Sequence, residues 1–375
     1  MTQKVQTKDI INVLESFAPK SLAFEGDPIG LQVGDLNSSV EKVMITLDVL
    51  ESVVDEAIEQ NVDLIIAHHP FIFKPLKSIN TNDEKGKIIN KLVKHDITVY
   101  AAHTNLDIAQ GGVNDWLMEQ LGLQPEGVVV PTTQDTLYKM VVFVPTSHED
   151  ELRNALAEAG AGHIGEYSHC TFNSEGFGTF KPQEGTNPYI GTTNELEKVQ
   201  ELRMETVVPV SILQDVIDQA NQAHPYEEMA YDVYPLELDG EPLGLGRMAT
   251  LNETTTLEQF AQTVKKAFNV PQLRFVGRSN KKVKKVAVIG GDGNKFIHQA
   301  KRQGADVLIT GDVYYHTAHD ALGMGLGMID PGHHVEEVMK DGLKNELESR
   351  TEANGYDVSF VSSNQVTEPF QFLGD

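Results

Sequence analysis

The stretch Asn61-Val62-Asp63-Leu64-Ile65-Ile66-Ala67-His68-His69-Pro70 decides the fold class of this chain. Its centre, residues 64–67, is a continuous apolar run that ends at a pair of histidines. The preceding stretch, 51–60, has helical spacing and charge. A short apolar run that follows a helix is typical of a parallel strand buried on both faces. We therefore expect an α/β fold in which polar residues follow a buried strand.

The same pattern recurs along the chain. The run 43–47 ends at Asp48, and the run 98–102 ends at His103. Late in the chain, residues 304–309 align directly with residues 61–66, which places Gly311-Asp312 opposite the histidine pair. We interpret the two regions as a duplicated β-α-β unit whose halves face each other. A chance likeness between two α/β segments is the alternative.

Residues from about 131 to 240 break this pattern. Their apolar runs and turn residues predict the order strand, helix, strand, strand, helix, strand, which is typical of a ferredoxin-like fold. The predicted strands cover 137–144, 167–171, 204–210 and 229–234, and the predicted helices cover 149–159 and 211–222. We therefore predict a first half of the core at 1–130, a ferredoxin-like α+β insert at 131–240, and a second half of the core at 241–375.

Composition restricts the class of protein. The net charge of −25 disfavours nucleic acid as a partner, because it repels phosphate backbones. Cys170 is the only cysteine, so an intramolecular disulfide and thiolate metal sites are excluded, as expected in a reducing cytoplasm. No run approaches the roughly 20 apolar residues of a membrane helix. The first ten residues, MTQKVQTKDI, lack the apolar core of a signal peptide.

Polar residues follow two neighbouring strands of the first half. His68 and His69 come directly after their strand, and adjacent strand residues point to opposite faces, so the two imidazoles can meet two different ions. Asp107 follows the run that ends at His103, and its two oxygens can bridge two cations. In open α/β sheets ligands bind at the carboxyl ends of the strands. These side chains are therefore candidate metal ligands.

A third group lies in the second half. His333 and Glu337 are four residues apart, which places both on one face of an α-helix. Each group also has a purely structural explanation. The histidine pair can cap a strand end, Asp107 can cap a helix N-terminus, and a histidine–glutamate pair is common on solvated helices.

Nitrogen and oxygen ligands without sulfur suit zinc, iron, manganese or nickel. Five protein ligands for two ions leave positions open for water, which a metal acidifies to a hydroxide nucleophile. We therefore predict two divalent ions per chain, with zinc favoured. The ligands are His68, His69, Asp107, His333 and Glu337.

Four motifs carry a family resemblance. They are Ala-His-His-Pro (67–70), His-Thr-Asn-Leu-Asp (103–107), Thr-Gly-Asp (310–312) and Gly-His-His-Val-Glu-Glu (332–337). Together they resemble the GTP cyclohydrolase 1 type 2 family, also called NIF-three-like. The stretch 224–232, His-Pro-Tyr-Glu-Glu-Met-Ala-Tyr-Asp, resembles the PII/CutA-like module of longer bacterial members. The resemblance implies a dinuclear site at the five ligands, a ring-shaped homohexamer, and hydrolytic opening of the GTP imidazole ring.

The predicted function is metal-dependent hydrolysis of a nucleotide or related small molecule, with GTP as the candidate substrate and His103 as the group that transfers protons. The alternative is a non-catalytic metal-binding regulatory protein whose insert senses a ligand. Asp312, His316 and His319 are candidates for supporting the ligands, with caps and solvated loops as their structural explanation. Gly290-Gly291-Asp292-Gly293 can cradle phosphate, but a tight turn is favoured.

Overall fold

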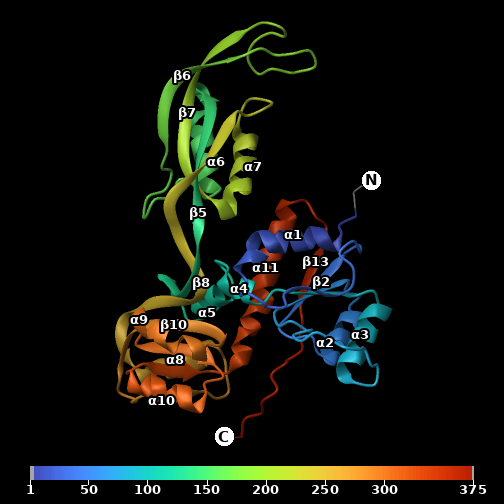
Figure 1. Cartoon of the computed structure of the whole chain (residues 1–375), viewed down its shortest axis with the longest axis vertical. Helices are drawn as coiled ribbons and strands as arrows, with labels where there is room; N and C mark the ends of the chain where they lie inside the picture. The colour runs from blue at the N-terminus through green and yellow to red at the C-terminus, as the bar shows by residue number, and fades with distance from the viewer. Residues whose placement is uncertain (1–3, 374–375) are drawn as a thin grey trace. The chain divides into compact units, whose positions relative to one another are not determined.

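The computed structural model describes residues 4–373, and the chain forms two compact units. Figure 1 labels many of their helices and strands. Unit 1 combines residues 1–133 with 243–375, and unit 2 consists of residues 134–242. The terminal residues 1–3 and 374–375, which the predicted segments 1–130 and 241–375 include, lie outside the described residues.

Unit 1 contains a five-stranded sheet built mainly from the first half of the chain. Its strand order is β1-β4-β3-β2-β13, and only β1 runs antiparallel to its neighbour. The strands are β1 (Gly30–Val33), β2 (Lys42–Thr46), β3 (Leu64–Ala67), β4 (Thr98–Ala101) and β13 (Ser359–Ser362). Every residue of β3 and β4 is buried, as expected for parallel strands covered on both faces. The last strand, β13, comes from the second half and pairs with β2.

The second half repeats this arrangement. Strands β10 (Lys282–Asp292), β11 (Val307–Gly311) and β12 (Gly327–Asp330) are parallel, and β9 (Arg274–Val276) lies antiparallel beyond β12. In the first half, β2, β3 and β4 are parallel in the same way, with β1 antiparallel beyond β4. In both halves the antiparallel strand precedes the three parallel strands in the sequence. The predicted duplication is therefore confirmed.

Helices cover the sheets and join the two halves of unit 1. Helix α11 contacts β2 and α1, and helix α5 contacts β10, so each half supplies a helix to the other. One apolar core contains buried side chains of both halves, such as Leu64 and Val286. The helices are α1 (Thr7–Phe17), η1 (Lys20–Leu22), α2 (Glu51–Glu59), α3 (Glu84–Lys94), α4 (Thr104–Ile108), α5 (Val113–Gln120), α8 (Leu257–Ala267), η4 (Asn294–Phe296), α9 (Ile297–Arg302), α10 (Tyr315–Gly323), η5 (His333–Glu337) and α11 (Val338–Ala353).

Unit 2 has the ferredoxin-like order β5-α6-β6-β7-α7-β8, with the sheet order β6-β7-β5-β8. The strands are β5 (Gly127–Pro145), β6 (Phe172–Phe180), β7 (Glu197–Pro209) and β8 (Tyr231–Thr256), and β5 and β8 contain the points where the chain passes between the units. Helices α6 (Glu149–Glu158) and α7 (Leu213–Ala223) lie side by side (Figure 1). Short 3₁₀ turns, η2 (Thr146–His148) and η3 (Val210–Ile212), precede them. Apolar side chains of the sheet, such as Val142 and Met204, share a core with the helices.

One predicted strand of the insert is wrong. Residues 167–171 form no strand, and β6 begins at Phe172 instead. His169 has a φ of 59°, and Tyr167 makes only an isolated bridge with Ile164, so this stretch turns rather than extends. Among the described residues, no helix has the length and apolar character to cross a bilayer.

Candidate metal centre

Six side chains converge where three parallel strands of unit 1 end. The carboxyl ends of β3, β4 and β12 lead into short segments that carry histidines and carboxylates. These segments supply His68 and His69 after β3, His103 and Asp107 after β4, and His333 and Glu336 in η5. The site therefore lies at the sheet edges where ligands bind in α/β proteins, and both halves contribute to it.

Glu336 lies at the centre of this cluster. Its Oε1 atom lies 3.8 Å from His68 Nε2, which in turn lies 3.5 Å from Asp107 Oδ1. Its Oε2 atom lies 3.2 Å from His69 Nε2 and 3.1 Å from His333 Nε2. The two carboxylate oxygens therefore face two different groups of ligand atoms, and Glu336 belongs to both.

Each of the four imidazoles is fixed through its Nδ1 atom. The acceptors are a backbone carbonyl or a carboxylate, so Nδ1 carries the proton and Nε2 faces the cluster. The distances are 2.9 Å from His68 to Ala102 O, 2.7 Å from His69 to Asp48, 2.9 Å from His103 to Asp27, and 2.6 Å from His333 to Asp312. Histidines that bind metals are oriented in this way by the partner of their other nitrogen.

Charges in the cluster shift its pKa values strongly. Burial opposes a charge on His69, but the carboxylates of Asp48 and Glu336 outweigh it and raise the pKa of His69 to about 10. Burial is likewise outweighed at His333, where Glu336 and Asp312 raise the pKa to about 9. Burial also opposes a charge on Glu336, yet the surrounding imidazoles hold its pKa well below the ordinary range. The imidazoles and carboxylates therefore form charged pairs, and a metal cation competes with protons for the same nitrogens.

Two buried atoms show that the cluster fits a cation. His68 Nε2 and Asp107 Oδ1 have no hydrogen-bond partner, although their residues are 0% and 6% exposed. Burial raises the pKa of Asp107. Polar atoms as deeply buried as these normally have partners. Two metal–ligand bonds of about 2.1 Å that meet at roughly 95–130° span separations such as the 3.1–3.8 Å found here.

The structure places Glu336, and not the predicted ligand Glu337, in the cluster. The prediction assumed an α-helix from His333 onward, in which residues four apart share a face. Residues 333–337 instead form a 3₁₀-helix, in which residues three apart share a face. The Glu337 side chain is 46% exposed and lies 3.3 Å from Lys340 Nζ, whereas the Glu336 side chain is 3% exposed.

The structure also bears on the roles expected for Asp107 and His103. Asp107 belongs to one of the two groups around Glu336, so the shared carboxylate is Glu336 rather than Asp107. Asp107 lies within α4, and the N-cap residue of the following helix α5 is Gly112, so Asp107 does not cap α5. A ring nitrogen of His103 lies within 4.8 Å of ligand atoms of His68 and His69. The geometry thus offers His103 as a metal ligand as well as a proton carrier.

Neighbouring residues support the cluster in different ways. A Cβ atom on Gly291 would lie 2.9 Å from Glu336 Oε1 and 3.2 Å from His333 Nε2, so the glycine leaves room for both side chains. Asp312 holds His333, as a supporting residue would.

The other two residues predicted to support the ligands lie apart from the cluster. His316 and His319 are exposed and contact the Tyr315 ring, and they belong to none of the metal-compatible groups among the described residues.

Comparison with known proteins identifies close relatives over nearly the whole chain. A sequence model of the family Duf34/NIF3 (NGG1p interacting factor 3) matches residues 5–369. A protein from Halalkalibacterium halodurans is 55% identical over 364 residues, which cover 97% of this chain and 98% of the relative. A Bacillus subtilis protein is 54% identical over 373 residues, which cover 100% of both chains. Both relatives are named GTP cyclohydrolase 1 type 2 homolog.

Solved structures agree with the sequence comparison. The crystal structure of a Bacillus cereus protein related to NIF3 is 54% identical, with a TM-score of 0.81, and the match covers 99% of this chain and 100% of that one. The Staphylococcus aureus protein SA1388 is 35% identical, with a TM-score of 0.70 and 100% of both chains covered. This chain therefore belongs to the Duf34/NIF3 family.

Proposed function

We propose that this protein is a hydrolase that binds a pair of divalent metal ions. The proposed ligands are His68, His69, Asp107, His333 and Glu336. The observation that carries the proposal is the position of Glu336, whose two oxygens face two separate groups of ligand atoms. The unpartnered, buried atoms of His68 and Asp107 support it.

The ligand types favour zinc, with iron, manganese and nickel as alternatives, because all donors are imidazole nitrogens or carboxylate oxygens. Divalent ions held there supply Lewis acidity and acidify water, which is the chemistry that hydrolysis needs. The protein's own residues fix the donors: Asp48 and Asp312 orient His69 and His333 through Nδ1.

The proposed substrate is a nucleotide or related small molecule, with GTP as the first candidate. Support comes from the relatives named GTP cyclohydrolase 1 type 2 homolog. We assign proton transfer to His103, because its Nδ1 is held by Asp27 and its side chain remains 23% exposed beside the cluster. Ring opening of GTP requires a proton to be supplied to a leaving nitrogen, which is a task for an imidazole.

A second candidate function is that of a metal-binding regulatory protein without catalysis. The observation that favours it is a cavity of about 950 Å³ in unit 2, a unit that contributes no residue to the metal centre. We also propose that the protein forms a homohexamer and acts in the cytoplasm. Light scattering on the purified protein would test the homohexamer.

The deciding experiment combines metal analysis with a turnover assay. Protein purified without chelators should contain close to two divalent ions per chain by elemental analysis. The same protein should open the GTP ring and release formate when it is metal-loaded, and should stop after dialysis against a chelator. Two ions without turnover would favour the regulatory function. A protein that takes up no metal even after reconstitution would contradict both.

A further inference from the structure

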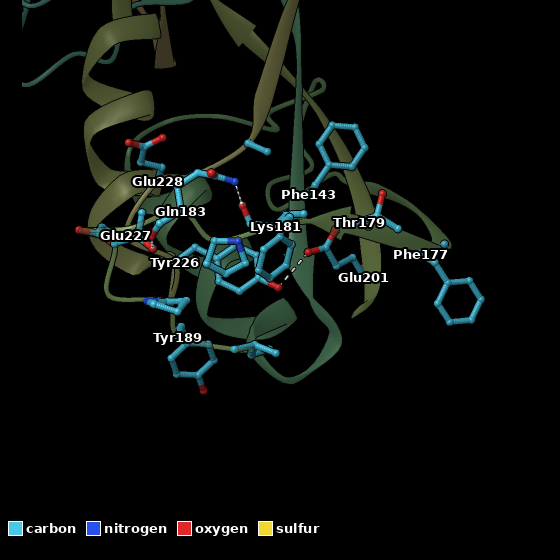
Figure 2. Close-up of a pocket in the computed structure, with 18 of the residues that line it drawn as sticks. Phe143, Phe177, Thr179, Lys181, Gln183, Tyr189, Glu201, Tyr226, Glu227 and Glu228 are labelled. Atoms are coloured by element: carbon cyan, nitrogen blue, oxygen red, sulfur yellow. Dashed lines mark hydrogen bonds between the residues drawn. The ribbon is translucent and has the colours of Figure 1, made fainter. Parts of the chain in front are cut away.

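The insert contains a large cavity on one side of its sheet. Its volume is about 950 Å³, and all of its lining residues lie within unit 2 (Figure 2). Strand register places Phe143 beside Arg203 and Glu201 beside Gly176, so strands β5, β7 and β6 together form its floor. A Cβ atom on Gly176 would meet nothing within 4 Å, which shows that the floor is open at this strand.

The loop 224–230 places an aromatic ring against this floor. His224 bonds Phe143 O through Nε2 at 2.9 Å, and its Nδ1 accepts the Tyr226 backbone N–H at 3.1 Å. This histidine therefore fixes the turn that presents Tyr226. The Tyr226 ring lies 5.6 Å from the Phe180 ring and 6.3 Å from the Tyr189 ring. Three aromatic rings from three segments thus surround one region of the cavity.

A buried carboxylate lies among these rings. Glu201 is 7% exposed, and its Oε1 accepts a hydrogen bond from the Tyr226 hydroxyl at 2.9 Å, as Figure 2 shows. In the part of the chain that the structure describes, no basic side chain makes an ion pair with Glu201. Buried charges in proteins are normally paired, because removing an ion from water is costly. The cavity therefore holds a buried negative charge whose cationic partner is not supplied by the fold.

The other lining residues also give the cavity a negative charge. Five glutamates line it, against two basic side chains, and one of the two, Arg203, is paired with Glu205. The lining glutamates are Glu175, Glu184, Glu201, Glu227 and Glu228. Such a lining repels phosphate and carboxylate groups and attracts cations. Aromatic faces around a carboxylate are the arrangement that recognises ammonium groups, because the ring faces are electron-rich.

We propose that this cavity binds a small organic cation, namely one or more ammonium groups carried on an apolar frame. The ammonium group contacts Glu201 and the faces of Tyr226 and Phe180, and the glutamates at the rim attract further positive charge. This site is separate from the metal centre, because it shares no residue with it. Its test is therefore independent of whether the protein is a hydrolase.

The test measures binding to the metal-loaded, full-length protein by titration calorimetry. The probes are choline and spermidine, and 3,3-dimethylbutan-1-ol serves as the uncharged isostere of choline. Choline should bind at least about tenfold more tightly than the isostere, because only its charged head group is attracted to the Glu201 carboxylate and to the ring faces. Glu201→Gln should keep the hydrogen bond to Tyr226 and weaken the binding of choline and spermidine by at least about tenfold. Glu158→Gln, an exposed charge on α6 outside the cavity lining, is the matched control and should change nothing.

A second variant keeps the proposal testable if Glu201→Gln misfolds. Phe180→Leu should weaken the binding of choline by about 2- to 30-fold and leave the binding of the uncharged isostere unaffected. The reason is that only the cation interacts with the ring face. Metal content and circular dichroism check that each variant is folded. Equal binding of choline and its isostere would overturn the proposal, as would unchanged affinities in both variants. Failure of all three probes to bind at 10 mM, or a change only in the protein's association state, would overturn it too.

Discussion

Replacement of Glu336 by glutamine should weaken metal binding at the proposed centre. The substitution keeps the shape of the side chain and removes the charge that lies 3.1–3.8 Å from the Nε2 atoms of His68, His69 and His333. Loss of a residue that merely supports a ligand costs about 10- to 100-fold in metal affinity. Because Glu336 faces both groups of ligand atoms, we expect at least that loss at each ion, or about 1.4–2.8 kcal/mol per ion.

The chain offers a matched control at the next position. Glu337 is 46% exposed and pairs with Lys340 at 3.3 Å, and a surface pair of this kind contributes about 0–1 kcal/mol. Glu337→Gln should therefore keep both ions. Affinities can be measured by competition with a chromogenic chelator, and stoichiometry by elemental analysis.

The thermal stability of the two variants gives a second readout. Metal that binds only the folded state stabilises it in proportion to the logarithm of its concentration over Kd. A 100-fold loss of affinity under saturating metal should therefore remove about 2.7 kcal/mol of that stabilisation for each ion in Glu336→Gln. If Glu336→Gln retained two ions at unchanged affinity, or if Glu337→Gln lost them equally, the assignment of Glu336 as the shared ligand would be refuted.

Three further predictions test individual roles. Asp107→Ala should lose one ion before the other, since Asp107 belongs to only one group around Glu336, and simultaneous loss of both ions in a metal titration would contradict this. His103→Gln should keep both ions and lose about 10²- to 10⁴-fold in turnover if His103 transfers protons, whereas loss of metal would make it a ligand. Burial lowers the pKa of His224, so the folded insert prefers the neutral imidazole ring. The stability of the insert should therefore be full above about pH 6.5 and fall as the pH falls. Hydrogen exchange of residues 134–242 measures this stability, and the loss due to His224 should be absent in His224→Asn.

Much of the fold could be predicted because it rests on local pattern. Buried parallel strands appear as continuous apolar runs, and each run of the first half, such as 64–67 and 98–101, proved to be buried throughout. The duplication was visible because both copies keep the same order of strands and helices. The pairing of β13 with β2 was not visible, because the choice of partner strand depends on the path of the chain and not on the residues of 359–362.

The insert shows the same limit. Its order of strands and helices followed from periodicity, but β6 was predicted about five residues too early, at 167–171. That stretch contains the aromatic and β-branched residues that strands favour, yet Gly162 and Gly165 have positive φ angles and hold the chain in turns. The cavity was not predictable either. It depends on Glu201 from β7 meeting Tyr226 from the loop after α7, a contact across 25 positions of sequence.

The predicted ligand Glu337 differs from Glu336, the residue that the structure places in the cluster, for a reason that the sequence contains only implicitly. Glu336 and Glu337 are adjacent, so an α-helical period selects the second and a 3₁₀ period selects the first. What decides between them is the approach to η5: Gly332 has a φ of 94°, and a Cβ atom on Gly311 would lie 2.8 Å from the backbone of His333. These glycines let the turn pack tightly against β11, which brings the third residue after His333 rather than the fourth toward β3. A histidine followed by two acidic residues at i+3 and i+4 therefore leaves the ligand ambiguous until the backbone after the preceding glycine is known.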